Sequence, residues 1–219
     1  MGRPFTASCT ASRTASLTAS LTGALALAAA LPVLAEPARA QTADAAAEAA
    51  APFGPQAGET APAFSLTDSQ GETRTLADLA GENGLVVYFN RSLDWCPICQ
   101  AQTLEVDEAA SGFAERGYAV AVITYDAPEV LARFDARRQV SLTLLSDEGS
   151  AVIDAFDIRD PVYDDPDSRA YGVPYPIAFV LGPDGQVKAK LWHEAGLGEQ
   201  RGYATRITPE DMFDTLDAL

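Results

Sequence analysis

The chain has 219 residues, of which 47% are hydrophobic and 21% are charged, and its formal net charge at pH 7 is −16. This length allows one ordinary globular domain with additional segments around it. The acidic surplus excludes nucleic acid and anionic membrane surfaces as favoured partners, because the phosphates of both repel an acidic protein.

The first forty residues have the pattern of a cleaved secretory signal peptide. Two arginines precede a stretch that becomes steadily more apolar over residues 17–34, and Ala38 and Ala40 supply the small residues that signal peptidase requires. We expect residues 1–40 to be removed before Gln41 and the mature protein to be periplasmic or secreted. An uncleaved anchor is the alternative, but polar residues leave the apolar run short for a spanning helix. No later stretch is long and apolar enough to insert stably in a membrane.

Residues 41–56 are rich in Ala and Pro and carry no core-forming pattern, so we expect a disordered linker there. The domain itself is expected over residues 57–219. Phe64 to Leu66 alternate with polar neighbours and predict a short edge strand, with residues 73–75 returning as its hairpin partner. Residues 76–79 predict one helical turn.

The middle of the chain alternates between apolar strands and helices. Leu85–Phe89 predict a buried strand, Gln100–Phe113 a helix, and Tyr118–Tyr125 a second buried strand. Asp126 is expected to cap a further helix that extends to about residue 138. This helix can start at Ala127-Pro128, since proline is tolerated in a first turn.

The last third continues the pattern and ends in a hairpin and a helix. Residues 142–145 are strand-like, residues 151–156 predict a helix, and residues 177–181 and 186–192 predict an antiparallel hairpin. Thr208 predicts the N-cap of a terminal helix. Alternating strands and helices followed by a hairpin predict an α/β fold with a mixed central sheet flanked by helices.

Loss of the signal peptide removes Cys9 and leaves Cys96 and Cys99 as the cysteines of the mature chain. A structural crosslink across so short a loop would remove little chain entropy. Two thiolates and the single His193 do not complete a tetrahedral zinc site. The spacing therefore predicts a redox-active disulfide, with no metal and no other cofactor.

The two cysteines stand where the buried strand passes into the following helix, so the helix N-terminus should favour a thiolate at Cys96. Pro97 withholds an N–H that the first turn leaves unpaired and stiffens the loop. Asp94 is expected to cap the helix, and Trp95 either shields the thiol or only packs. Arg91, five residues before Cys96, is expected to be solvated, and a contribution of positive potential to the site is the alternative.

Five stretches carry a family resemblance: Gly58–Leu66, Leu76–Leu79, Trp95–Cys99, Leu144–Asp147 and Pro176–Gly185. In this order and spacing they are similar to the peroxiredoxin-like (alkyl hydroperoxide reductase/thiol-specific antioxidant, redoxin) branch of the thioredoxin-fold superfamily. The resemblance covers about residues 57–192. It implies a thioredoxin-like three-layer sandwich and an oxidoreductase with antioxidant activity.

The resemblance also assigns roles to residues. Cys96 matches the attacking cysteine, Cys99 the resolving one, and Trp95 the aromatic residue that precedes the dithiol. Pro176 matches the cis-proline that faces the dithiol, with Pro174 as a competing candidate.

One departure from the family bears on the reaction. Peroxiredoxins carry Thr or Ser three residues before the attacking cysteine and Pro seven before it, where this chain has Leu93 and Phe89, although Ser92 is adjacent. We therefore expect exchange with protein or small-molecule disulfides, supported by a dithiol electron donor. A two-cysteine thiol peroxidase that reduces peroxides is the alternative. A copper-binding chaperone that uses the two cysteines and His193 is a more distant one.

Overall fold

The computed structural model describes residues 53–193 and 202–219. All of these residues belong to one unit of the chain, Gln41–Leu219. The predicted signal peptide and residues 41–52 of the predicted linker lie outside the described residues. Among the described residues, no helix combines the length and apolar character needed to cross a bilayer.

The described part of the chain is built on one mixed sheet with the strand order β2-β1-β5-β4-β3-β6-β7. Strands β3, β4 and β5 run parallel to one another, and the other neighbours pair antiparallel. The strands are β1 (Ser65–Asp68), β2 (Thr73–Thr75), β3 (Gly84–Phe89), β4 (Tyr118–Thr124), β5 (Thr143–Ser146), β6 (Ile177–Leu181) and β7 (Val187–Trp192).

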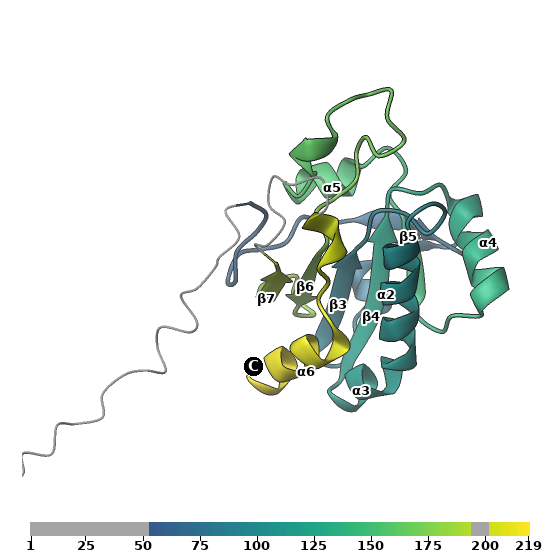
Figure 1. The fold of residues 1–219 in the computed structure, drawn as a ribbon. Coiled ribbons are helices and arrows are strands. Elements are labelled where there is room, and N and C mark those ends of the chain that lie inside the picture. Colours follow the sequence, from purple (N-terminus) through teal and green to yellow (C-terminus); the bar gives the residue numbers. More distant parts are fainter. Residues whose placement is uncertain (1–52, 194–201) are drawn as a thin grey trace, which may run out of the picture. The chain divides into compact units, whose positions relative to one another are not determined.

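Helices cover both faces of this sheet and complete three layers (Figure 1). Side chains of α2, α3, α4 and α6 pack on one face, and those of α1 and α5 on the other. The expected α/β fold, with a mixed sheet between helices, is confirmed. The helices are α1 (Leu76–Leu79), α2 (Pro97–Glu108), α3 (Ala110–Glu115), α4 (Pro128–Arg138), α5 (Ala151–Ala155) and α6 (Pro209–Asp217), with 3-10 turns η1 (Pro161–Tyr163) and η3 (Gly202–Ala204).

Strand β3 is the predicted buried strand, and all its residues are buried. Because successive side chains of a strand point to opposite faces, Val86 and Tyr88 join the core under α2, while Val87 and Phe89 join the core on the other face. A continuous apolar run is what a strand covered on both faces requires. The C-terminal end of β3, an inner strand, therefore places the following loop near the middle of the sheet at the end where β3 finishes.

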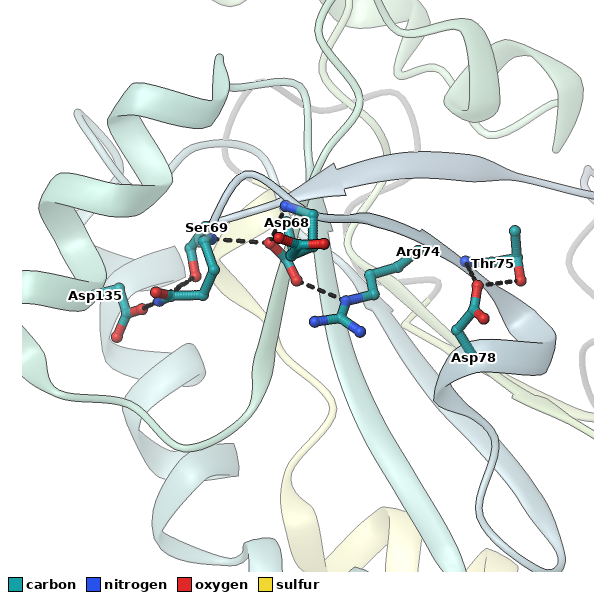
Figure 2. A network of polar contacts seen from close by, with 8 residues as sticks. Asp68, Ser69, Arg74, Thr75, Asp78 and Asp135 are labelled. Atoms are coloured by element: carbon teal, nitrogen blue, oxygen red, sulfur yellow. Dashed lines mark hydrogen bonds and ion pairs between the residues drawn. The ribbon is translucent and has the colours of Figure 1, made fainter.

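The β1–β2 hairpin was predicted, but β1 is not the edge strand. It pairs with β5 on its other side, so β2 forms the edge. Figure 2 shows the polar contacts of this hairpin. Arg74 Nε donates to the carboxylate of Asp68 at 2.7 Å, within the hairpin. Ser69 Oγ donates to Asp135 of α4 at 3.0 Å. Burial alone would raise the pKa of Asp68, but the hydrogen bonds from Arg74 and from two backbone N–H groups outweigh it and lower this pKa.

The packed domain begins before residue 57. Phe53 stacks on Tyr175 with ring centroids 4.7 Å apart and meets Trp192 edge-on at 5.4 Å. Lys190 Nζ also donates to the Phe53 carbonyl at 2.9 Å. Residues that the sequence assigned to the linker thus pack against β7, because an aromatic side chain there covers apolar surface that the sheet would otherwise expose.

Candidate active site

Cys96 and Cys99 are joined in a disulfide where the loop after β3 enters α2, with Cα atoms 5.3 Å apart. Cys96 is the N-cap of α2, and the backbone N–H of Cys99 donates to Cys96 Sγ at 3.3 Å. Pro97 occupies the first helical turn, as expected. The helix begins at Pro97 and ends at Glu108 rather than Phe113, because Ala109 leaves the helical conformation before α3. Cys96 retains 3% of its surface and Cys99 none.

The loop before the dithiol is held by the buried carboxylate of Asp126. The Leu93 backbone N–H donates to it at 2.6 Å, Ser92 Oγ at 2.7 Å, and Thr124 Oγ1 at 3.0 Å. Burial raises the pKa of Asp126, although these hydrogen bonds act in the opposite direction. The expectation that Asp126 caps α4 is wrong: Ala127 is the N-cap, because the Asp126 carboxylate is turned toward the dithiol loop.

Arg206, from the segment between η3 and α6, contacts both sulfur atoms. Its Nη2 lies 3.1 Å from Cys99 Sγ and 3.9 Å from Cys96 Sγ. Its Nη1 donates to Asn90 Oδ1 at 2.8 Å and approaches Gln102 Oε1 at 3.4 Å. Burial, with the nearby charge of Arg91, lowers the pKa of Arg206 to about 10. Sequence reasoning missed this residue, because no local pattern marks an arginine that reaches a site from a distant segment.

Arg91 is buried, with 2% of its surface exposed, so the expectation that it is solvated is wrong. Its guanidinium lies between the rings of Tyr163 and Tyr203, at 4.0 and 4.2 Å from their centroids, and 5.4 Å from that of Trp95. Nη1 donates to Tyr163 Oη at 3.3 Å. The rings replace water around the charge, as cation–π contacts do.

Trp95 packs beside the dithiol in a defined orientation. Its Nε1 donates to Tyr125 Oη at 2.9 Å, and that hydroxyl donates in turn to the Arg169 carbonyl. The guanidinium of Arg169 lies 5.0 Å from the Trp95 ring. The indole is therefore fixed by Tyr125, directly after β4, on one side and by the segment that follows η1 on the other.

The model of the AhpC/TSA family matches residues 57–190. The chain belongs to the AhpC/TSA family. It is 30% identical over 133 residues to peroxiredoxin Bcp of Escherichia coli, which covers 61% of this chain and 83% of that protein. It is 25% identical over 155 residues to the thiol-disulfide oxidoreductase ResA of Bacillus cereus, which covers 70% of this chain and 80% of ResA.

Solved structures of the family share the fold. Peroxidoxin BcpB from Mycobacterium tuberculosis superposes with a TM-score of 0.59 at 23% identity, covering 75% of this chain and 97% of that one. Peroxiredoxin Q of Xanthomonas campestris superposes with a TM-score of 0.55 at 25% identity, covering 71% and 90%. The thioredoxin-like three-layer sandwich is confirmed, and this AhpC/TSA protein is an oxidoreductase of the thiol peroxidase and thiol-disulfide oxidoreductase group.

Ser92 is adjacent to the position where peroxiredoxins of the AhpC/TSA family carry Thr or Ser, but its hydroxyl contacts groups other than the cysteines. Ser92 Oγ donates to Asp126 and accepts from the backbone N–H groups of Asp94 and Trp95 at 3.0 and 3.4 Å. No hydrogen bond joins Ser92 to either sulfur in the described part of the chain. Asp94 does not cap α2 either, because Cys96 holds that position.

Pro176 does not have the conformation that the AhpC/TSA resemblance implied. Every peptide bond among the described residues is trans, so the expected cis-proline is wrong for Pro176 and for Pro174 alike. Tyr175 N–H donates to the Ile158 carbonyl at 2.8 Å just before this bond. The trans form is the less costly isomer of an X–Pro bond. Ile177 pairs with Phe89, the last residue of β3. Pro176 therefore still lies beside the C-terminal end of β3.

His193 contacts the backbone rather than the sulfurs. Its Nε2 lies 3.0 Å from the carbonyl oxygen of Arg206. Across residues 53–193 and 202–219, no group of three or more His, Cys, Asp or Glu side chains is arranged to hold a metal ion. This part of the AhpC/TSA domain therefore offers no set of three such ligands for the copper ion of the more distant alternative.

Proposed function

We propose that this protein is an exported thiol–disulfide oxidoreductase that works through Cys96 and Cys99. The observation that carries the proposal is the disulfide at the N-terminus of α2, with Cys96 as the N-cap and Cys99 one turn further on. A cysteine in this position meets unpaired backbone N–H groups and the positive end of the helix dipole, which favour its thiolate.

In the reduced protein, the Cys96 thiolate attacks one sulfur of a substrate disulfide. Its electron pair forms the new S–S bond, and the substrate S–S bond breaks to release one thiolate, which takes a proton from water. Cys99 then attacks Cys96 Sγ, which restores the intramolecular disulfide and releases the second substrate thiol. Cys96 is assigned the attacking role because it keeps a small exposed surface while Cys99 keeps none. A dithiol electron donor completes the cycle by reducing the pair.

A two-cysteine thiol peroxidase is the second candidate, and the 30% identity to a peroxiredoxin favours it. There the Cys96 thiolate would cleave the O–O bond of a peroxide, and Cys99 would condense with the sulfenic acid and expel water. The engagement of Ser92 with Asp126 counts against this reading, since the hydroxyl is not available to a peroxide.

One pair of assays distinguishes the two candidates. Reduction of a protein disulfide and consumption of hydrogen peroxide are measured on the wild type, on Cys99→Ser and on Cys96→Ser. Disulfide reduction that is lost in both variants supports the proposal. Peroxide turnover without any activity on protein disulfides would contradict it and establish the peroxidase instead.

The export part of the proposal is supported by the N-terminal pattern of residues 1–40. Expression with fractionation of the cell, followed by N-terminal sequencing, tests it. A mature chain that begins at Gln41 outside the cytoplasm supports export, and an intact N-terminus in the cytoplasm would contradict it.

A further inference from the structure

Arg206 brings a positive charge directly onto the disulfide. Its Nη2 is closer to the buried sulfur of Cys99, at 3.1 Å, than to that of Cys96, at 3.9 Å. The guanidinium is held in this position by Nη1, which donates to Asn90 Oδ1 at 2.8 Å. Asn90 follows β3 and Arg206 precedes α6, so the contact joins two separate parts of the fold.

Within residues 53–193 and 202–219, this charge has no carboxylate to balance it. Its hydrogen-bond partners are the neutral amides of Asn90 and Gln102 and the two sulfurs, and Arg206 Nε is buried without any partner. Among the described residues, no ion pair joins it to Asp or Glu. A largely buried cation without a counter-charge is costly, unless a negative group forms next to it.

In the part of the chain that the structure describes, the charged and titratable neighbours of Arg206 do not supply that negative group. Arg91 is a second cation, Tyr203 carries a phenol rather than a carboxylate, and both act on Arg206 through space. His193 touches its backbone carbonyl. Guanidinium remains protonated near neutral pH. The groups beside it that can become anionic on reduction are the cysteine sulfurs.

We propose that Arg206 is a positioning residue that stabilises the Cys99 thiolate and thereby biases the cysteine pair toward its reduced state. This inference rests on the proposed redox function of the pair. A disulfide is neutral and a thiolate is negative, so the cation lowers the free energy of the reduced form more than that of the oxidised form. Relative to the same pair without the cation, a pair whose reduced form is stabilised is a stronger oxidant and a weaker reductant.

The same contact serves the resolving step. Cys99 must attack Cys96 Sγ as a thiolate, and Arg206 favours this form without accepting a proton, which passes to water. The electron pair of Cys99 forms the intramolecular S–S bond, and the bond from Cys96 to the substrate sulfur breaks, with its electrons leaving on the substrate thiolate. The buried cysteine thus needs no neighbouring base.

The test compares Arg206→Met and Arg206→Lys with a control, in a Cys9→Ser background that leaves two cysteines. Arg133→Met is the matched control, because it removes the same charge from an exposed position on α4. Each protein is equilibrated with mixtures of reduced and oxidised glutathione. The thiolate fraction of Cys99 is then followed against pH in a Cys96→Ser derivative of each, and thermal unfolding shows that each variant is folded.

In Arg206→Met we expect the equilibrium to move at least tenfold toward the disulfide, equivalent to a potential about 30 mV lower. The Cys99 thiolate fraction at neutral pH should fall with it. Arg206→Lys should recover part of both effects, and Arg133→Met should match the wild type. If Arg206→Met does not fold, Arg206→Gln is tested in its place, since it keeps an N–H donor without the charge.

An equilibrium within twofold of the wild type in a folded, uncharged variant would overturn the role of Arg206 and leave the proposed function intact. A lysine variant that behaves like the methionine variant would also overturn it, because the effect would then not depend on charge. A wild-type protein that forms no disulfide at any glutathione ratio would contradict the proposed function itself.

Discussion

The guanidinium of Arg206 lies 3.1 Å from Sγ of Cys99, although 107 residues separate the two in the chain. The contact exists because the segment before α6 returns to the edge of the sheet where β3 ends. There Asn90 and Gln102, one on each side of the dithiol in sequence, orient the guanidinium. The chemistry of the cysteine pair in this protein is therefore tied to its C-terminal segment.

The two cysteines should be separable by trapping. Cys99→Ser should accumulate a stable mixed disulfide between Cys96 and a substrate thiol, because the resolving thiolate is absent. Cys96→Ser should accumulate none, since the remaining cysteine is fully buried. Mass spectrometry of the protein after incubation with a small disulfide checks both. Equal adduct formation in the two variants would show that the assignment of attacking and resolving cysteines is wrong.

The carboxylate of Asp126 should be a strong determinant of stability. Asp126→Ala removes the acceptor of three hydrogen bonds, from Ser92, Leu93 and Thr124. We expect the free energy of unfolding to fall by about 3–5 kcal/mol, because buried donors lose their partner. Urea denaturation measures this. A loss below about 1 kcal/mol would show that water replaces the carboxylate without difficulty.

Asp126 should also make stability depend on pH. Its pKa is raised in the folded protein by burial, so its contribution is fully present below the unfolded pKa of about 3.9 and is lost as pH rises through the higher folded pKa. Relative to Asp126→Asn, the wild type should thus lose stability over this interval. Denaturation of both proteins at several pH values checks the sign. A difference that does not change with pH would contradict the shift.

Asp68 should have the opposite pH dependence. Its pKa is lowered because hydrogen bonds from Arg74 and from backbone N–H groups outweigh its burial. Its contribution is therefore present above about pH 3.9 and is lost as pH falls through the lower folded pKa. Asp68→Ala should cost about 2–3 kcal/mol at neutral pH, mainly from the N–H groups of Gln70 and Glu72 that lose their acceptor. Urea denaturation of both proteins at several pH values checks this. A difference in unfolding free energy that stays the same at every pH would contradict it.

Two glycines should respond differently to alanine. Gly84 begins β3 at φ +134°, and a Cβ there would overlap the carbonyl oxygen of Leu181. Gly71 has φ +84°, with no atom within 4 Å of such a Cβ. We expect Gly84→Ala to cost more than about 3 kcal/mol through overlap and strain, and Gly71→Ala about 1 kcal/mol through strain alone. Thermal unfolding of the two variants provides the comparison, and equal losses would show that β3 can shift to relieve the overlap.

The sequence was sufficient for features that local chemistry determines. The unbroken apolar run of β3 specifies a strand covered on both faces, and Pro97 after Cys96 is compatible with the start of a helix at that point. The spacing of the two cysteines indicates their pairing, and it was found. Each of these signals lies within a few residues, so each can be read without knowing the rest of the fold.

Tertiary structure decided the partners of the buried polar groups. Asp126 stands where the sequence predicts a helix cap, but its carboxylate accepts a hydrogen bond from the loop before the dithiol. Arg91 is enclosed by aromatic rings, and Arg206 contacts the sulfurs. The trans bond before Pro176 was likewise found only in the structure. A buried charge takes whatever partner the packed core places beside it, and residues distant in sequence leave no local pattern of that proximity. The redox pair was therefore visible in the sequence, while the charge beside it depended on how the chain folds back on itself.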